Sequence, residues 1–226
     1  GQLHGGSETP RMTDVSRIRL RKQLGHGAVE RVQQVCSAME LAIAPLLADI
    51  VDNSVLHAVG ITGSTGSGKN PSATTHTPER HSNLFAYKAL EHRHTPEVVA
   101  QLERFSGRRP NVQFVPHSGP FARGIHMTVM ATAHKPVTTE TLRETVASFY
   151  ADKPFVRVVD GMPRIKNVVA SNYAEIGVAA NGVNIVVTAV IDNLVKGAAG
   201  GALQWMNRLL ELPETAGLTQ AAPAWT

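Results

Sequence analysis

The chain has 226 residues, 42% of them hydrophobic, which is enough for one large domain, or for one domain and a fragment of a second. The net charge is +4, the basic residues are scattered and aromatic residues make up only 5%, so nucleic acid is disfavoured as a partner and anionic metabolites are favoured. The single cysteine excludes an internal disulfide. Without a signal peptide or an apolar run of membrane-spanning length, we expect a cytoplasmic protein with no membrane contact.

The first predicted element is a helix over residues 35–50. Its apolar side chains recur at helical spacing, at Met39, Ile43, Leu46, Leu47 and Ile50. Pro45 predicts a kink or an early end, because proline lacks an N–H and its ring collides with the preceding turn. The preceding residues 1–34 have the polar composition of a disordered leader.

A glycine-rich loop follows the predicted strand Val55–Thr62. Over residues 63–68 glycines alternate with serine and threonine, and glycine lets a backbone come close to an anionic ligand. The loop matches the pattern of a nucleotide-triphosphate loop, but Asn70 and Pro71 stand where that motif needs a magnesium-binding hydroxyl and an opening helix. We therefore reject a triphosphatase.

A basic and aromatic segment comes next. We expect a loop over residues 78–82 and a strand over residues 84–90. His92 and His94 are the best catalytic candidates, because imidazole titrates near neutrality and can carry a proton in either direction. They could also bind zinc, but two histidines and the single cysteine do not complete a zinc ligand set, so we predict no metal. A helix then begins at Thr95 and ends at Gly107.

The remaining elements alternate between strands and helices, which indicates an α+β fold. We expect strands over residues 112–115, 125–133, 155–159 and 183–191, and helices over residues 138–150 and 192–210. Arg123 suits a carboxylate or an acyl phosphate, or it pairs with a nearby acid. Asp192 and Asn193 are suitable caps for the last helix.

Several segments in the same order resemble one enzyme family. They are ITGSTGSGKNPSATTH (residues 61–76), YKALEHRHTPEV (87–98), VPHSGPFARGI (115–125), DNLVKGAAGGALQWMN (192–207) and LPETAGL (212–218). Together they resemble the N-acetyl-γ-glutamyl-phosphate reductases of arginine biosynthesis, which belong to the semialdehyde dehydrogenase group.

The resemblance implies a glyceraldehyde-3-phosphate-dehydrogenase-like catalytic domain over residues 35–210, followed by a tail over residues 211–226. Such a domain has a mixed, mainly antiparallel sheet with helices on one face. The other face would join subunits, so a homodimer or homotetramer is expected. Residues 1–34 resemble parts of the family's coenzyme domain, so they are either a remnant of a nucleotide-binding domain or the disordered leader.

The implied reaction is the NADPH-dependent reduction of N-acetyl-γ-glutamyl phosphate to the semialdehyde, through a cysteine thioester. Cys36 is the nucleophile if two residues are deleted before it; aligned without a gap, Gln34 takes that position and the chain is inactive. By the same resemblance His92 is the base, and His94, His117 and Arg123 bind substrate.

The resemblance places four residues beside NADP(H). Gly63, Thr65 and Gly66 would border its nicotinamide, and Asn193 would hold the carboxamide, since an amide both donates and accepts hydrogen bonds. Two other functions stay open. The chain could reduce a related acyl phosphate, of aminoadipate or aspartate, or it could be an inactive remnant that serves as an oligomerisation module.

Overall fold

The computed structural model of the chain describes residues 34–47, 49–52 and 55–223. The two interpretations of residues 1–34 therefore concern residues that, apart from Gln34, lie outside the described part of the chain.

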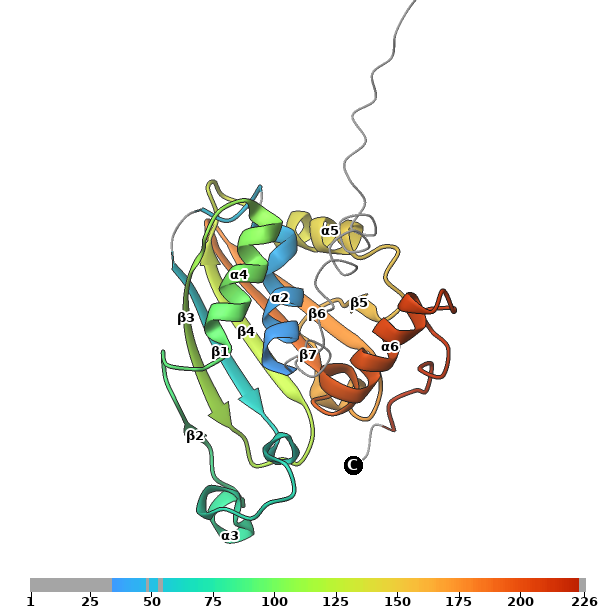
Figure 1. The fold of residues 1–226 in the computed structure, drawn as a ribbon. Helices are drawn as coiled ribbons and strands as arrows, with labels where there is room; N and C mark the ends of the chain where they lie inside the picture. The colour runs from blue at the N-terminus through green and yellow to red at the C-terminus, as the bar shows by residue number, and fades with distance from the viewer. Residues whose placement is uncertain (1–33, 48, 53–54, 224–226) are drawn as a thin grey trace, which may run out of the picture. The chain divides into compact units, whose positions relative to one another are not determined.

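The described residues form one mixed sheet with the strand order β2-β3-β1-β4-β7-β6-β5 (Figure 1). The strands are β1 (Val55–Thr62), β2 (Phe85–Ala86), β3 (Asn111–Ser118), β4 (Ile125–Thr132), β5 (Val156–Val158), β6 (Ala174–Asn181) and β7 (Asn184–Ile191). Only β1 with β3 and β5 with β6 pair in parallel; the other neighbours are antiparallel. The expected mixed, mainly antiparallel sheet is confirmed.

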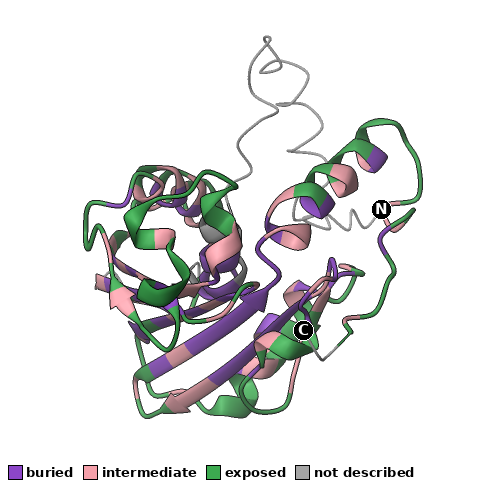
Figure 2. Ribbon diagram, turned by 90° about the horizontal axis from the view of Figure 1, so that it is seen from below, coloured by how far each residue is buried: buried purple, intermediate pink, exposed green. Residues whose placement is uncertain are grey.

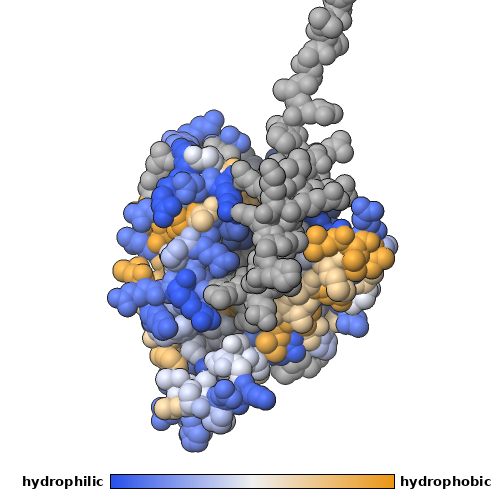
Figure 3. All heavy atoms as spheres, viewed as in Figure 1, coloured by the Kyte–Doolittle hydropathy of each residue, from blue (hydrophilic) through white to orange (hydrophobic). Residues whose placement is uncertain are grey.

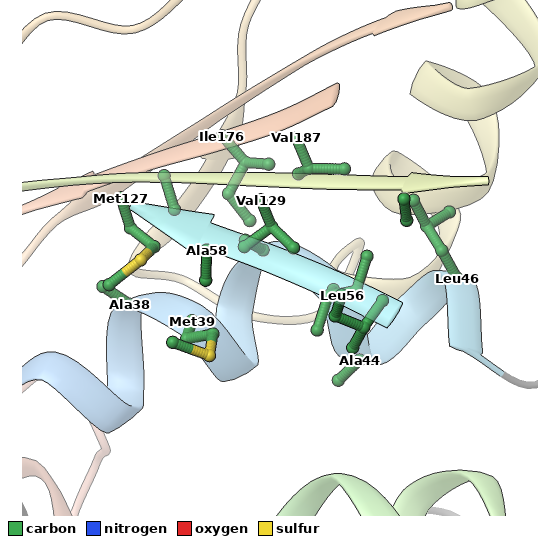
Figure 4. Close-up of a cluster of buried hydrophobic side chains, with 14 of the residues drawn as sticks. Ala38, Met39, Ala44, Leu46, Leu56, Ala58, Met127, Val129, Ile176 and Val187 are labelled. Atoms are coloured by element: carbon green, nitrogen blue, oxygen red, sulfur yellow. The ribbon is translucent and has the colours of Figure 1, made fainter. Parts of the chain in front are cut away.

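Three helices cover one face of this sheet: α2 (Gln34–Leu47), α4 (Thr95–Ser106) and α5 (Thr139–Phe149) (Figure 1). Their buried side chains share one core with alternate residues of the strands, so purple residues follow the strands in Figure 2. At one end of the sheet, the last residues of the parallel strands β1 and β3 lie beside the first residue of β4. Figure 4 shows Met127, at the start of β4, over the part of α2 that carries Ala38 and Met39, so the first turns of α2 lie at that end.

The opposite face of the sheet carries the other alternate side chains. His57 lies across from Met130, which lies across from Val186, and Met130 is 38% exposed. The loop after β5 crosses this face at Gly177, because a Cβ there would stand 2.2 Å from the carbonyl oxygen of Gly161. Among the described residues, this face is therefore partly exposed at the centre of β1 and β4.

The last helical segment is irregular. A turn at residues 192–194 leads into a π-helical segment (Val195–Ala199) and then into α6 (Gly200–Leu209). The expected single helix over residues 192–210 is therefore wrong in its first third. The outer side of α6 is apolar and appears orange in Figure 3. Its exposed apolar residues are Trp205, Met206, Leu209 and Leu210.

The expected strand over residues 84–90 is also wrong beyond Ala86. Lys88 and Leu90 have φ of 45° and 63°, in the left-handed region, so the chain turns instead of staying extended. The expected loop over residues 78–82 is in part a short helix, α3 (Thr77–Arg80), which Pro78 and Glu79 favour in its first turn. Strand β6 was not predicted, because its alanine and glycine residues have low strand propensity.

Candidate active site

Three loops meet where β1, β3 and β7 end, and one asparagine joins them. The Asn193 side chain is fully buried; its Oδ1 accepts from the Gly124 N–H at 2.8 Å, and its Nδ2 donates to Thr65 Oγ1 at 2.9 Å. Thr65 Oγ1 in turn donates to the carbonyl oxygen of Ala122 at 2.7 Å. Gly63 lies so close that a Cβ there would stand 2.5 Å from that same oxygen. The glycine loop is therefore held against the turn before β4.

A buried ion pair ties the same turn to two further loops. Arg123 donates to the Asp192 carboxylate through Nε at 3.0 Å and through a terminal nitrogen at 2.7 Å. The carboxylate also accepts backbone N–H groups of Ala170, Leu194 and Val195, at 2.6 to 2.8 Å. The N-cap of the π-helical segment is Leu194 and not Asp192 or Asn193, but Asp192 accepts the backbone N–H groups of Leu194 and Val195 where the segment begins. Arg123 pairs with an acid, the second of its two expected roles.

These contacts set the charge of Asp192. Burial alone would raise the pKa of its carboxyl, but the hydrogen bonds from Arg123 and the backbone amides outweigh burial and lower it. Asp192 is therefore an anion at neutral pH. It neutralises much of the Arg123 charge, and the Arg123 side chain keeps only 28% of its surface exposed.

The two candidate histidines lie between the sheet and the start of α4. His92 is 8% exposed and packs edge-on against Phe114, with 5.2 Å between ring centroids. The centroid of the His92 ring lies 4.7 Å from that of the His94 ring and 6.0 Å from that of the Tyr87 ring. Phe114 in turn covers Gly60, whose missing side chain leaves room for the Phe114 ring.

Both imidazoles are held neutral. Burial, followed by the positive charges of Arg93 and Lys88, lowers the pKa of His92. Burial, His92 and Arg93 lower the pKa of His94 to about 4. Arg93 Nε donates to His94 Nε2 at 2.8 Å, which requires that nitrogen to be unprotonated. A neutral imidazole is the form that can accept a proton from a thiol.

A line of contacts connects His92 with the beginning of α2. His92 packs on Phe114; a Cβ at Gly60 would stand 3.1 Å from the Phe114 ring and 2.9 Å from the Met127 methyl group. Met127 lies over the part of α2 that carries Ala38 (Figure 4). The first turns of α2, which contain Cys36, thus lie on the same face of the sheet as His92.

Glu40 gives independent support for this neighbourhood. Burial, with the Glu97 charge adding to it, raises the pKa of Glu40 to about 7. Glu97 stands in the first turn of α4, just after His94, so the start of α4 lies beside α2 one turn beyond Cys36. The side chain of Cys36 itself lies outside the described part of the structure.

The structure does not bring every candidate together. His117 is separated from Phe114 by an odd number of positions on β3, so it faces the open side of the sheet, away from His92. Arg123 and Asn193 belong instead to the loops that are joined by the bonds of Asn193 and Asp192. One site feature had no signal in the sequence: the burial of Arg80, whose guanidinium donates to the carbonyl oxygen of Gly119 at 2.9 Å.

The residues assigned to NADP(H) fit it poorly in this conformation. Asn193 has no exposed surface. The Thr65 hydroxyl already donates a hydrogen bond to the carbonyl oxygen of Ala122 and accepts one from Asn193. Only Gly66 offers an exposed backbone. Within the described ranges no group of three or more histidine, cysteine or acidic side chains is placed to bind a metal ion. None of the helices in those ranges has the length and apolar character needed to cross a membrane.

Solved structures define the class of this fold. A probable aspartate-semialdehyde dehydrogenase from Pseudomonas aeruginosa aligns with a TM-score of 0.62 at 17% identity, over 79% of this chain and 61% of its own. Aspartate semialdehyde dehydrogenase II from Vibrio cholerae, complexed with ASA, aligns with a TM-score of 0.59 at 15% identity, over 78% of this chain and 60% of its own. The fold is that of semialdehyde dehydrogenases.

Residues 35–193 match the family described as semialdehyde dehydrogenase, dimerisation domain, and the chain belongs to that family. It is 43% identical to the N-acetyl-gamma-glutamyl-phosphate reductase of Streptococcus sanguinis. The aligned region of 185 residues covers 80% of this chain and 54% of the relative. The enzyme of that name from Methanosarcina mazei is 42% identical over 187 residues, 81% of this chain and 54% of the relative. The chain thus spans about half the length of these curated relatives.

Proposed function

We propose that this chain is the catalytic and dimerisation part of a cytoplasmic N-acetyl-γ-glutamyl-phosphate reductase. The names of relatives at about 40% identity support the substrate. The observation that supports the proposal is the line of contacts from His92 through Phe114, Gly60 and Met127 toward the part of α2 that carries Ala38, two residues after Cys36.

The residues of the chain would supply the acylation half of the reaction. The start of α2 favours the thiolate of Cys36, because the positive end of the helix dipole lowers a thiol pKa. The thiolate attacks the carbonyl carbon of the acyl phosphate, the bond to the phosphate oxygen breaks, and phosphate leaves with its electron pair. His92 accepts the thiol proton, since its ring is neutral.

The second half of the reaction needs a hydride donor, and the relatives' name implies a reductant. Asn193 and Thr65 are already hydrogen-bonded to other loops, so the binding of NADP(H) by these residues remains a prediction from the sequence. Asn193 instead acts as a positioning residue for the glycine loop.

Homo-oligomer formation belongs to the same proposal. The description of the family as a dimerisation domain supports it. The open face, with Met130 partly exposed beside His57 and Val186, is the surface that a second copy would cover.

Acylation of Cys36 tests the proposal without the coenzyme. The whole chain is mixed with N-acetyl-γ-glutamyl phosphate, and the protein mass and the released phosphate are measured. We expect one acyl group per chain, a matching burst of phosphate, and neither in Cys36→Ser. Acylation by aspartyl or aminoadipyl phosphate alone would assign the related reductases. A thiol that no acyl phosphate modifies would leave the oligomerisation module as the function.

A further inference from the structure

Three cationic side chains gather around Tyr87 and His92. Arg80, in α3, is 9% exposed and is held by its bond to the carbonyl oxygen of Gly119. Lys88 and Arg93 flank the pair of aromatic rings along the chain, and Arg93 contacts His94. The positive charges of Arg80 and Arg93 both lower the pKa of the Tyr87 phenol against the larger, opposite effect of burial, and those of Arg93 and Lys88 act on His92.

None of these cations is neutralised within the described part of the chain. The ion pairs there engage Arg109, Arg123, Arg143, Arg208 and Lys153, whereas no carboxylate pairs with Arg80, Lys88 or Arg93. An arginine as buried as Arg80 normally has an anionic partner, because removing a charge from water is costly.

The backbone around the cluster is shaped and fixed. Lys88 and Leu90 adopt left-handed φ values, which are rare for residues other than glycine and gather at binding sites. The N–H groups of Tyr87 and Leu90 bond to the carbonyl oxygens of Pro116 and Phe114, both at 3.0 Å. The segment that carries Lys88 is thereby pinned to β3, with His92 against the same strand.

We propose that Arg80, Lys88 and Arg93 form a binding site for an oxyanion of the substrate beside Tyr87 and His92. The oxyanion is either the phosphoryl group of the acyl phosphate or its carboxylate. Arginine and lysine are the side chains that bind such groups, through forked hydrogen bonds and through charge. The identity of the ligand rests on the proposed function, but the anion site itself does not.

Calorimetric titration of the whole chain with inorganic phosphate, and separately with N-acetylglutamate, tests this site. Arg80→Gln removes the charge and keeps a polar amide, and Lys88→Gln makes the same change at an exposed position. Arg164→Gln, an exposed arginine in the loop after β5, is the matched control. We expect each cluster variant to bind the relevant anion at least about 10-fold more weakly, as for the loss of one charge-assisted hydrogen bond, and the control to bind normally.

The two ligands distinguish the sources of the oxyanion. Weakened phosphate binding with normal N-acetylglutamate binding assigns the phosphoryl group, and the reverse assigns the carboxylate. Absence of binding by both anions, or equal weakening in the control, overturns the site. Because binding needs neither thiol nor coenzyme, anion binding without acylation of Cys36 would refute the reductase and keep the site. Normal Cys36 acylation, at an unchanged half-saturating substrate concentration, in both cluster variants would refute the site alone.

Discussion

Replacing Asp192 with asparagine should destabilise the fold strongly. The carboxylate is fully buried and accepts two hydrogen bonds from Arg123 and three from backbone amides. An amide in its place turns an NH2 group toward donors and leaves Arg123 without its counter-ion. Breaking one partner of a buried ion pair costs about 3 to 5 kcal/mol, and because 28% of the Arg123 side chain is exposed we expect the lower end, about 3 kcal/mol.

Urea unfolding followed by circular dichroism measures this loss. The control is Asp160→Asn, which breaks an ion pair with Arg143 but removes a side chain that is 94% exposed, so it should cost less than about 1 kcal/mol. Because folding lowers the pKa of Asp192, its contribution is present above the unfolded pKa of about 3.9 and is lost as the pH falls through the folded value. The difference in unfolding free energy between wild type and Asp192→Asn should therefore become smaller at acidic pH. Equal losses in the two variants, or a gap independent of pH, would refute the role given to Asp192.

Three further outcomes follow from the packing. Gly60→Ala should lower the unfolding free energy by about 1 to 3 kcal/mol, because its Cβ would collide with Met127 and Phe114; an unchanged urea midpoint would contradict the close contact. His94 should stay neutral down to a pH of about 5, as read from its imidazole NMR signals, since its pKa is lowered to about 4; its contribution to stability should fade as the pH drops from about 6.5 toward that value, and a midpoint near 6.5 would contradict its burial. Met130→Lys should shift the chain toward monomer in sedimentation, whereas the same change at exposed Ala202 on α6 should not; an oligomer unaffected by Met130→Lys would place the interface elsewhere.

Local patterns in the sequence were enough for the regular elements. The β-branched run Val55–Thr62 forms β1 with the predicted bounds, and Pro96 and Gly107 mark the two ends of α4 as expected. The same rules failed where one residue's conformation depends on its neighbours in space. Lys88 and Leu90 turn the chain away from the expected strand, and alanine-rich β6 forms because it pairs with both β5 and β7.

The site was predictable in its residue types and not in its contacts. His92 and His94 lie just before α4, and His92 packs on Phe114 of β3; their closeness to Cys36 stays a prediction. The role of Asn193 could not be read from the sequence, because its partners Thr65 and Gly124 are set by how three strands align. The alternation of β3 placed His117 on the far face, which the motif alone did not reveal.

The bond between Thr65 and Asn193 has a consequence for how the protein comes to exist. The two residues are 128 positions apart, so the glycine loop cannot be secured until the chain has been synthesised through Asn193. Contacts of such long sequence separation form late, after the local hairpins. A nascent chain will therefore carry Cys36 well before its glycine loop is fixed in place.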